Sequence, residues 1–135
     1  MEKTNSYLFV YGSLLDPSNQ HALFLKMHCS FFGDARFRGK LYDTGEYPGA
    51  LYEPGSKAFV NGKVFKMDDA GTVLPVLDEY EGFGDNELQP NEFIRMLIDV
   101  ETESGLLQCW MYVYNWPVEG MKFICTGNYL QYLGR

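Results

Sequence analysis

The pattern of apolar residues around Glu81 places it for acid–base chemistry. Leu74, Leu77 and Glu81 stand at i, i+3 and i+7 in a segment that predicts a helix over residues 72–80, so Glu81 continues the apolar face of that helix. A carboxyl group that loses water there has a raised pKa, and a pKa of about 6–7 suits a general base. The alternative is an exposed glutamate at the helix end with no chemical role.

The backbone amides of Gly12, Ser13 and Leu14 form the second candidate. They follow the apolar run of residues 7–11, which predicts a buried strand that brings its last amides to one point. Glycine lets a ligand approach the backbone closely, and amides near the start of a following helix attract a carboxylate or an oxyanion. An ordinary tight turn between strand and helix is the alternative.

Other kinds of catalytic and binding site find little support. Ser13 lacks the GxSxG pattern and no histidine stands in a recognisable supporting position, so a serine triad is not predicted. His21 and His28 have no cysteine or carboxylate at metal-ligand spacing and are interpreted as surface or packing residues. The glycines form no nucleotide-binding pattern. The sequence therefore predicts neither a metal nor a cofactor.

The elements that must position these residues begin with the strand at 7–11. Asp16 and Pro17 indicate a helix start, and the apolar second half of the helix over 17–26 predicts that a broad face packs on a sheet. Residues 31–42 predict one or two strands. The turn-rich loop 42–49 either lines a pocket or connects two strands while its tyrosines cover the core.

The middle of the chain predicts a hairpin and then the helix that carries Glu81. Residues 50–52 and 58–66 are expected to pair across the turn 53–57. Asn61-Gly62 fits a two-residue turn, but the alternation of the surrounding residues favours one continuous strand. Thr72 is expected to cap the helix over 72–80, with Pro75 in its first turn and Gly82 at its end.

The last third of the chain predicts a second hairpin. Residues 93–101 and 106–115 alternate on either side of the turn 102–105, after a polar loop at 82–92. The second of these strands has bulky residues on both faces, which is typical of a central strand covered on each side.

Composition limits the class of protein and its partners. The 135 residues, 46% of them hydrophobic, are expected to form a single domain, 1–135. The net charge of −7 and the absence of clustered Lys and Arg argue against a nucleic-acid partner. No stretch resembles a secretory signal or approaches the ~20 apolar residues of a membrane span. We expect a soluble, cytoplasmic protein that does not bind membranes.

The three cysteines support the same compartment. Cys29, Cys109 and Cys125 are odd in number and form no CxxC pair, and each has apolar or aromatic neighbours in sequence. This predicts buried, reduced thiols, which suit the cytosol. Nothing in the sequence predicts an oligomeric state.

Three stretches together resemble the gamma-glutamylcyclotransferase-like family. They occur in the family's order and read YLFVYGSL at 7–14, LYDTGEYPG at 41–49 and LDEYEG at 77–82. The resemblance implies an α+β fold in which a mixed, mostly antiparallel, barrel-like sheet is joined by a few short helices. It also implies a substrate class: gamma-glutamyl amides or amines, released as 5-oxoproline and a free amine.

The same resemblance implies roles for single residues. Glu81 is similar to the family's catalytic acid/base, and the backbone of Tyr11, Gly12, Ser13 and Leu14 to its glutamyl-binding loop. The substrate's own amine would attack, with Glu81 moving the proton, so no nucleophilic side chain and no cofactor are needed. The loop amides would hold either the α-carboxylate or the developing oxyanion.

Tyr47 and Pro48 would form a wall of the pocket by the same resemblance. Two positions depart from the family's pattern. Phe93 stands where many members have a tyrosine followed two residues later by an arginine, here Arg95, and Asn128 stands at a position of the tail motif that is usually aspartate. Two other functions are compatible with the same pocket: a small-molecule-binding module without turnover, and another amide transfer such as the removal of a gamma-glutamyl protecting group.

Overall fold

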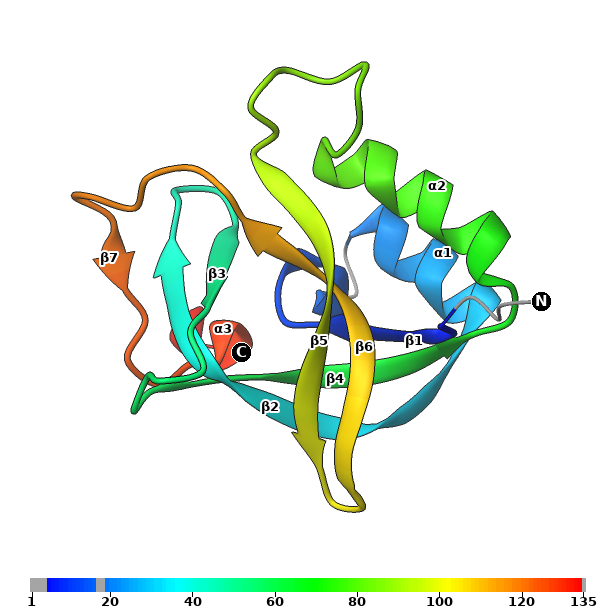
Figure 1. The fold of residues 1–135 in the computed structure, drawn as a ribbon, viewed down its shortest axis with the longest axis horizontal. Helices are drawn as coiled ribbons and strands as arrows, with labels where there is room; N and C mark the ends of the chain where they lie inside the picture. The colour runs from blue at the N-terminus through cyan, green and yellow to red at the C-terminus, as the bar shows by residue number, and fades with distance from the viewer. Residues whose placement is uncertain (1–4, 17–18, 135) are drawn as a thin grey trace.

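The computed structural model describes residues 5–16 and 19–134, and its centre is a β-sheet that closes on itself (Figure 1). The strands of the ring follow one another in the order β2-β4-β1-β6-β5, and β5 pairs with β2 again. β1 and β6 are parallel, and the other neighbours in the ring are antiparallel. Their bounds are β1 Tyr7–Val10, β2 Cys29–Asp43, β4 Phe59–Met67, β5 Phe93–Thr102 and β6 Gly105–Tyr114. The predicted fold class, with a mixed, mostly antiparallel, barrel-like sheet, is confirmed.

The remaining elements lie around this ring. β3 and β7 both pair with the end of β2, while α1 and α2 lie side by side on one flank of the barrel (Figure 1). Their bounds are η1 Ser13–Leu15, α1 Gln20–His28, β3 Pro48–Tyr52, α2 Ala70–Glu81, β7 Lys122–Phe123 and α3 Tyr129–Tyr132.

Alternation along the strands builds two hydrophobic clusters. On β6, Cys109, Met111 and Val113 belong to the cluster inside the barrel. Tyr112 and Tyr114 belong to the cluster beneath the two helices. Both clusters are buried, so the prediction that this strand is covered on each face is confirmed, and it follows from the period of two along a strand.

α2 begins earlier than the sequence predicts. Asp69, not Thr72, is the cap: its carboxylate accepts from the backbone N of Gly71 at 3.1 Å and from Oγ1 of Thr72 at 2.8 Å. Pro75 consequently lies beyond the first turn. The predicted end is confirmed, because Gly82 adopts the left-handed conformation at φ 72°. Glu81 is therefore the last residue of the helix.

α1 differs more from its prediction. It is capped by Asn19, whose side chain accepts from the backbone N of His21 at 2.7 Å, so the helix does not begin at Asp16-Pro17; Pro17 lies outside the described residues. The broad packing face is also wrong, because Leu25 is buried whereas Leu23 and Met27 are exposed. α2 covers much of the same flank of the sheet, and α1 contributes a narrow edge to that cluster.

The strands between the helices show one confirmed prediction and one error. Residues 59–67 form the continuous strand β4, with Asn61-Gly62 inside it. The expected hairpin of 50–52 with 58–66 is wrong: β3 pairs with residues 39–43 of β2, and β4 pairs with residues 29–38 of the same strand. Residues 31–42, predicted as one or two strands, belong to the single strand β2, which has a bulge between Phe31 and Gly33.

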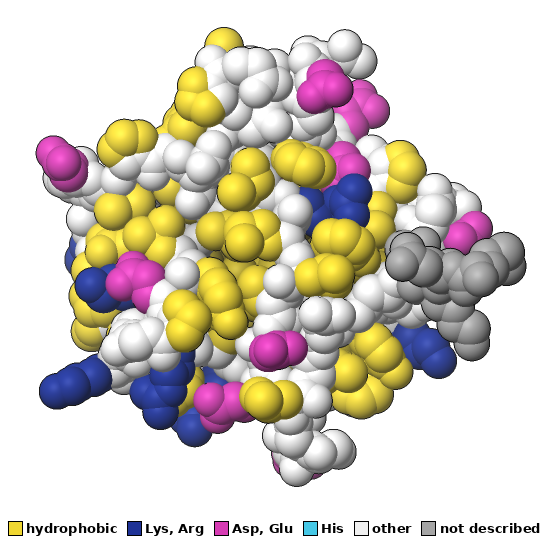
Figure 2. Space-filling model, viewed as in Figure 1, with side chains coloured by type: hydrophobic (Ala, Val, Ile, Leu, Met, Phe, Trp, Pro, Cys, Tyr) yellow, Lys and Arg dark blue, Asp and Glu magenta, His cyan; other side chains and the backbone are white. Residues whose placement is uncertain are grey.

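The surface carries mixed charge. On the face in Figure 2, hydrophobic side chains cover much of the area, and Lys and Arg side chains are interspersed with acidic ones. Three exposed ion pairs show this alternation: Arg36–Glu101, Lys40–Glu53 and Lys63–Asp34. Within the described residues, no helix has the length and hydropathy to cross a membrane.

The cysteines are all free, but the expectation of three buried thiols is only partly right. Cys109 is buried, Cys29 is half-buried and Cys125 is exposed. Burial raises the pKa of the Cys29 thiol to about 11 and that of Cys109 to about 12. Cys125 lies in the irregular segment after β7, where the aromatic neighbours in sequence do not cover it.

Candidate active site

A cavity of about 180 Å³ opens where the end of β1, the end of α2 and the start of β5 meet. Five segments contribute to its wall: β1 with the turn after it, the loop before β3, the end of α2, the start of β5, and β6. The lining residues are Leu8, Phe9, Val10, Tyr11, Gly12, Leu14, Tyr47, Pro48, Tyr80, Glu81, Glu92, Phe93 and Tyr112.

The fold brings together nearly all the residues that the sequence singled out. Tyr11, Gly12, Leu14, Tyr47, Pro48 and Glu81 all line this cavity. The backbone of Ser13 continues the same turn as the first residue of η1, and its side chain lies outside the described part of the structure. Of the two interpretations of loop 42–49, the geometry matches the one in which the loop lines a pocket.

Glu81 reaches the cavity from the last turn of α2. Its side chain is half-buried at the cavity wall, and the loss of water raises the pKa of its carboxyl group to about 8. The negative charge of Glu92 adds to this rise. The sequence indicated the direction of the shift, and the folded environment makes it larger than the sequence suggested.

The turn at Gly12 brings the backbone close to the opposite wall. A Cβ atom on Gly12 would lie 2.7 Å from Cγ of Pro48, so a larger residue would push the two walls apart. The backbone N of Leu15 donates to the carbonyl O of Gly12 at 2.9 Å and closes the turn. The first N–H groups of a helical turn have no partner within it, so they can point at a ligand.

Tyr11 is a fixed part of the wall. Its hydroxyl donates to the carbonyl O of Tyr112 at 2.7 Å and accepts from the backbone N of Ala50 at 3.3 Å. Burial, and to a lesser extent the charge of Glu81, raises the pKa of Tyr11 well above its ordinary range. The hydroxyl therefore stays protonated and ties β1, β3 and β6 together beside the cavity.

Tyr47 and Glu92 are hydrogen-bonded neighbours in the cavity wall. The Tyr47 hydroxyl donates to Oε2 of Glu92, and burial together with this bond raises the pKa of Tyr47 above its ordinary range. Thr44 holds the loop that carries Tyr47, since its backbone N and its Oγ1 both donate to the carbonyl O of Tyr47, at 3.1 and 2.6 Å.

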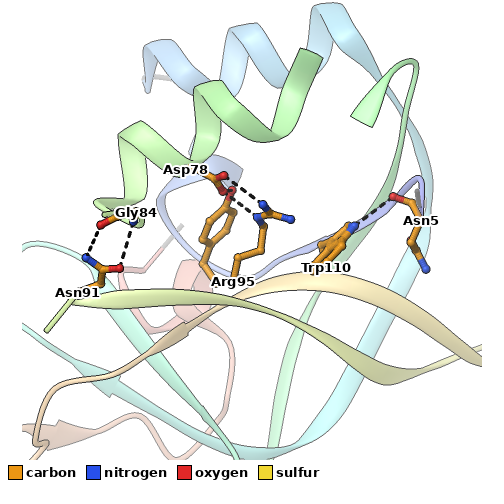
Figure 3. A network of polar contacts seen from close by, with 7 residues as sticks. Asn5, Asp78, Gly84, Asn91, Arg95 and Trp110 are labelled. Atoms are coloured by element: carbon orange, nitrogen blue, oxygen red, sulfur yellow. Dashed lines mark hydrogen bonds and ion pairs between the residues drawn. The ribbon is translucent and has the colours of Figure 1, made fainter. Parts of the chain in front are cut away.

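A partly buried ion pair ties α2 to the barrel one turn before Glu81 (Figure 3). Asp78 accepts from Nε of Arg95 at 2.8 Å and from a terminal guanidinium nitrogen at 3.2 Å, and the Tyr112 hydroxyl donates to it at 2.7 Å. The guanidinium lies over the ring of Trp110, 4.5 Å from its centre. Asp78 is thus turned toward the barrel and not toward water, and its side chain is only 20% exposed.

Comparison with known proteins is decisive for the family. The family described as "Gamma-glutamyl cyclotransferase, AIG2-like" matches residues 8–131. The chain belongs to this family. It is also 36% identical over 125 residues to the "Gamma-glutamylcyclotransferase family protein YtfP" of Escherichia coli (strain K12), an alignment that covers 91% of this chain and 95% of that protein.

Solved structures agree with this assignment. The solution NMR structure of ytfP from Escherichia coli has a TM-score of 0.65 and 34% identity, and the match covers 93% of this chain and 97% of that one. The crystal structure of YkqA from Bacillus subtilis has a TM-score of 0.71 at 23% identity, covering 96% of this chain and 41% of that one. The second likeness supports the fold alone.

The two departures from the pattern of the gamma-glutamyl cyclotransferase family have different locations. Phe93 is buried in the cavity wall, with its ring centre 5.9 Å from that of Tyr47 and 5.3 Å from that of Tyr114. It supplies aromatic surface where a tyrosine would add a hydroxyl. Asn128 lies outside this wall and caps α3, where it accepts from the backbone N of Gln131 at 3.0 Å.

Sequence reasoning missed three polar residues of the wall: Tyr80, Glu92 and Tyr112. Tyr112 had a signal, because the alternation of β6 put it on the face opposite Cys109. Glu92 had none, since it ends a polar loop without periodicity.

Neither of the two histidines lines this cavity. The ring of His21 packs on Tyr80 and that of His28 on Phe24, at 4.1 and 4.6 Å between centres, which confirms their interpretation as packing residues. The described residues contain no group of three or more His, Cys, Asp or Glu side chains that could hold a metal ion.

Proposed function

We propose that the protein is a cyclotransferase that converts a gamma-glutamyl amide or amine into 5-oxoproline and a free amine. Glu81 is the general acid/base of this reaction. The observation that supports it best is the meeting of the Glu81 carboxyl group and the turn at Gly12 and Leu14 in one cavity. Membership of the gamma-glutamyl cyclotransferase family supports the same reaction.

The proposed chemistry needs one group that moves a proton twice. Glu81 takes a proton from the substrate's α-amine, whose nitrogen attacks the γ-carbonyl carbon. When the tetrahedral intermediate collapses, the C–N bond of the amide breaks and Glu81 returns the proton to the leaving nitrogen. A carboxyl group with a pKa near 8 is suited to both steps, because it is neither a strong acid nor a strong base at neutral pH.

The turn after β1 is the proposed binding site for the rest of the glutamyl group. The backbone amides of Gly12, Ser13 and Leu14 hold either its α-carboxylate or the oxyanion that develops on the γ-carbonyl. Tyr11 supports this turn, and Tyr47 and Pro48 form the opposite wall. The substrate supplies its own nucleophile, so the proposed reaction uses no cofactor.

A panel of gamma-glutamyl amines tests this function. The purified protein is incubated with gamma-glutamyl derivatives of amino acids, alkylamines and diamines, and 5-oxoproline is measured by mass spectrometry. We expect release from at least one class above the uncatalysed rate. Tight binding of panel members without release from any of them would instead indicate a small-molecule-binding module.

A further inference from the structure

Glu92 lines the same cavity as Glu81 but has no part in the proton transfers above. It reaches the wall from the segment directly before β5, and its side chain is half-buried. We propose that Glu92 is a specificity-determining residue that binds an ammonium group of the substrate. This inference rests on the proposed function and identifies the charge that the pocket selects.

The charge of the wall is the first argument. Among the described residues that line the cavity, Glu81 and Glu92 are carboxylates and none is Lys, Arg or His. Most of the other lining residues are aromatic or aliphatic, and electrostatic interactions are stronger in such surroundings than in water. A ligand with a cationic group therefore complements this wall better than a ligand with only negative charge.

The backbone around Glu92 is firmly held. Its carbonyl O accepts from the backbone N of Asn115 at 2.7 Å. The side chain of the neighbouring Asn91 exchanges two hydrogen bonds with the backbone of Gly84, each 3.1 Å, and donates to the carbonyl O of Leu88 at 3.1 Å. The bonds between Asn91 and Gly84 (Figure 3) fix the end of the loop directly before Glu92. The position of the Glu92 backbone at the cavity wall is thereby fixed as well.

The Glu92 carboxylate is oriented but not saturated by its known partner. The Tyr47 hydroxyl donates to Oε2, whereas a carboxylate can accept about four hydrogen bonds. An ammonium group carries three donors and prefers a charged acceptor. The pair of Tyr47 and Glu92 therefore presents an acceptor whose position is set before the ligand arrives.

Glu92 also acts on Glu81 through its charge. Burial is the larger cause of the raised pKa of Glu81, and the charge of Glu92 is the second cause. The same two causes, in the same order, raise the pKa of Tyr114. Two carboxylates in one cavity repel each other. An ammonium group bound at Glu92 would offset that repulsion when Glu81 loses its proton.

The ammonium can come from two parts of a gamma-glutamyl substrate. One is the α-ammonium that every such substrate carries, and the other is a second cationic group on the amine that is released. Two probes separate these sources: the gamma-glutamyl amide of diaminobutane, and the amide of pentylamine, in which a methyl group replaces the second ammonium.

Binding of the two probes is measured by calorimetry on protein that carries Glu81→Gln, so that no turnover occurs. The affinities are compared with and without the additional change Glu92→Gln. Glu103→Gln, at an exposed residue in the β5–β6 turn, is the matched control for charge. Circular dichroism checks that each variant is folded.

We expect Glu92→Gln to weaken binding by about tenfold, the effect of losing one hydrogen bond to a charged group. Equal weakening of both probes assigns the α-ammonium to Glu92, and weakening of the diaminobutane probe alone assigns the second ammonium. Unchanged affinities for both probes, or no binding of either, would overturn the proposal. Release of 5-oxoproline by the unaltered protein is scored separately, so a failed reaction with a Glu92-dependent affinity would contradict only the proposed function.

Discussion

At the scale of single residues, the pKa of Glu81 governs how the proposed reaction depends on conditions. Burial in the cavity wall raises this pKa from an ordinary value of 4.5 to about 8, and the charge of Glu92 contributes. At neutral pH most molecules therefore carry a protonated Glu81, and only the deprotonated minority can act as a base.

The rate should consequently rise with pH. Below pH 8 we expect kcat/KM to increase by about tenfold per pH unit, because the fraction of deprotonated Glu81 increases in that proportion. Glu92→Gln should move the midpoint of this rise to lower pH by removing a negative charge, whereas Glu103→Gln should not. A pH–rate profile measures this, and a midpoint between pH 4 and 5 in the unaltered protein would show that Glu81 is not shifted.

The same raised pKa should make the folded protein less stable as pH rises, whereas the rate increases with pH. The folded-state pKa of Glu81 lies above the ordinary value, so its favourable contribution is complete below about pH 4.5 and is lost as pH rises through about 8. Glu81→Gln avoids a buried charge, so its Tm should exceed that of the unaltered protein by several degrees at about pH 9 and by little at about pH 5. Thermal unfolding followed by circular dichroism checks this, and a Tm difference independent of pH would contradict it.

At the scale of elements, the position of Glu81 depends on how α2 is attached to the barrel. Asp78 lies one turn before Glu81 and joins Arg95 of β5 and Tyr112 of β6 (Figure 3). Both side chains of the ion pair are about one-fifth exposed, 20% for Asp78 and 19% for Arg95. Removal of one partner leaves the other charge partly buried without compensation.

Asp78→Asn should therefore destabilise the protein by about 1–3 kcal/mol. Asp34→Asn is the matched control: it removes the same kind of charge from the pair with Lys63, where Asp34 is 78% exposed, and should change stability by less than about 1 kcal/mol. Urea denaturation gives both values. Equal effects of the two substitutions would show that the contacts of Asp78 do not hold the helix.

Local patterns predicted many elements, and the errors have two causes: competing helix caps, and pairing between distant strands. The period of two identified β4, β5 and β6, and Gly82 identified the end of α2. The starts of both helices were misplaced because Asn19 and Asp69 act as caps beside equally plausible Asp16 and Thr72. The β3–β4 hairpin was wrong because β2 is long enough to pair with both strands, which no local pattern reveals.

In the candidate site, too, some residues could be found from local patterns and others depend on tertiary packing. Glu81 followed from helical spacing, and Gly12 from the end of an apolar strand, so both could be found from the sequence. Glu92 and the ion pair of Asp78 with Arg95 depend on which face of α2 meets β5, and that contact is set by tertiary packing.

At the scale of the whole molecule, closure of the barrel brings some strands so close together that no side chain fits between them. β2 and β5 close the ring through the pairs Ala35–Thr102 and Arg36–Glu101. Inside the ring, a Cβ atom on Gly62 of β4 would lie 2.3 Å from the carbonyl O of Val10 and 2.7 Å from the ring of Phe9. β1 ends at this contact, immediately before the turn that lines the cavity.

Gly62→Ala should therefore destabilise the protein by about 1–3 kcal/mol, because β1 and β4 must separate to admit the methyl group. Gly33→Ala is the control, since a Cβ atom there meets nothing within 4 Å, and its effect should stay within about 0.5 kcal/mol. Urea denaturation measures both. If Gly62→Ala left the free energy of unfolding unchanged, β1 and β4 could separate at little cost, which would contradict this account of the packing.

The most direct test of the central claim compares two glutamates of α2 on a gamma-glutamyl amine that the protein converts. Glu81→Gln removes the carboxyl group that enters the cavity, and Glu79→Gln makes the same chemical change at an exposed position two residues earlier. The measurement is kcat for release of 5-oxoproline by folded protein. We predict a loss of about 10²–10⁴-fold for Glu81→Gln, the usual contribution of a general acid/base, and no loss for Glu79→Gln. Retention of most of the activity by Glu81→Gln would contradict the assignment of Glu81 as the acid/base.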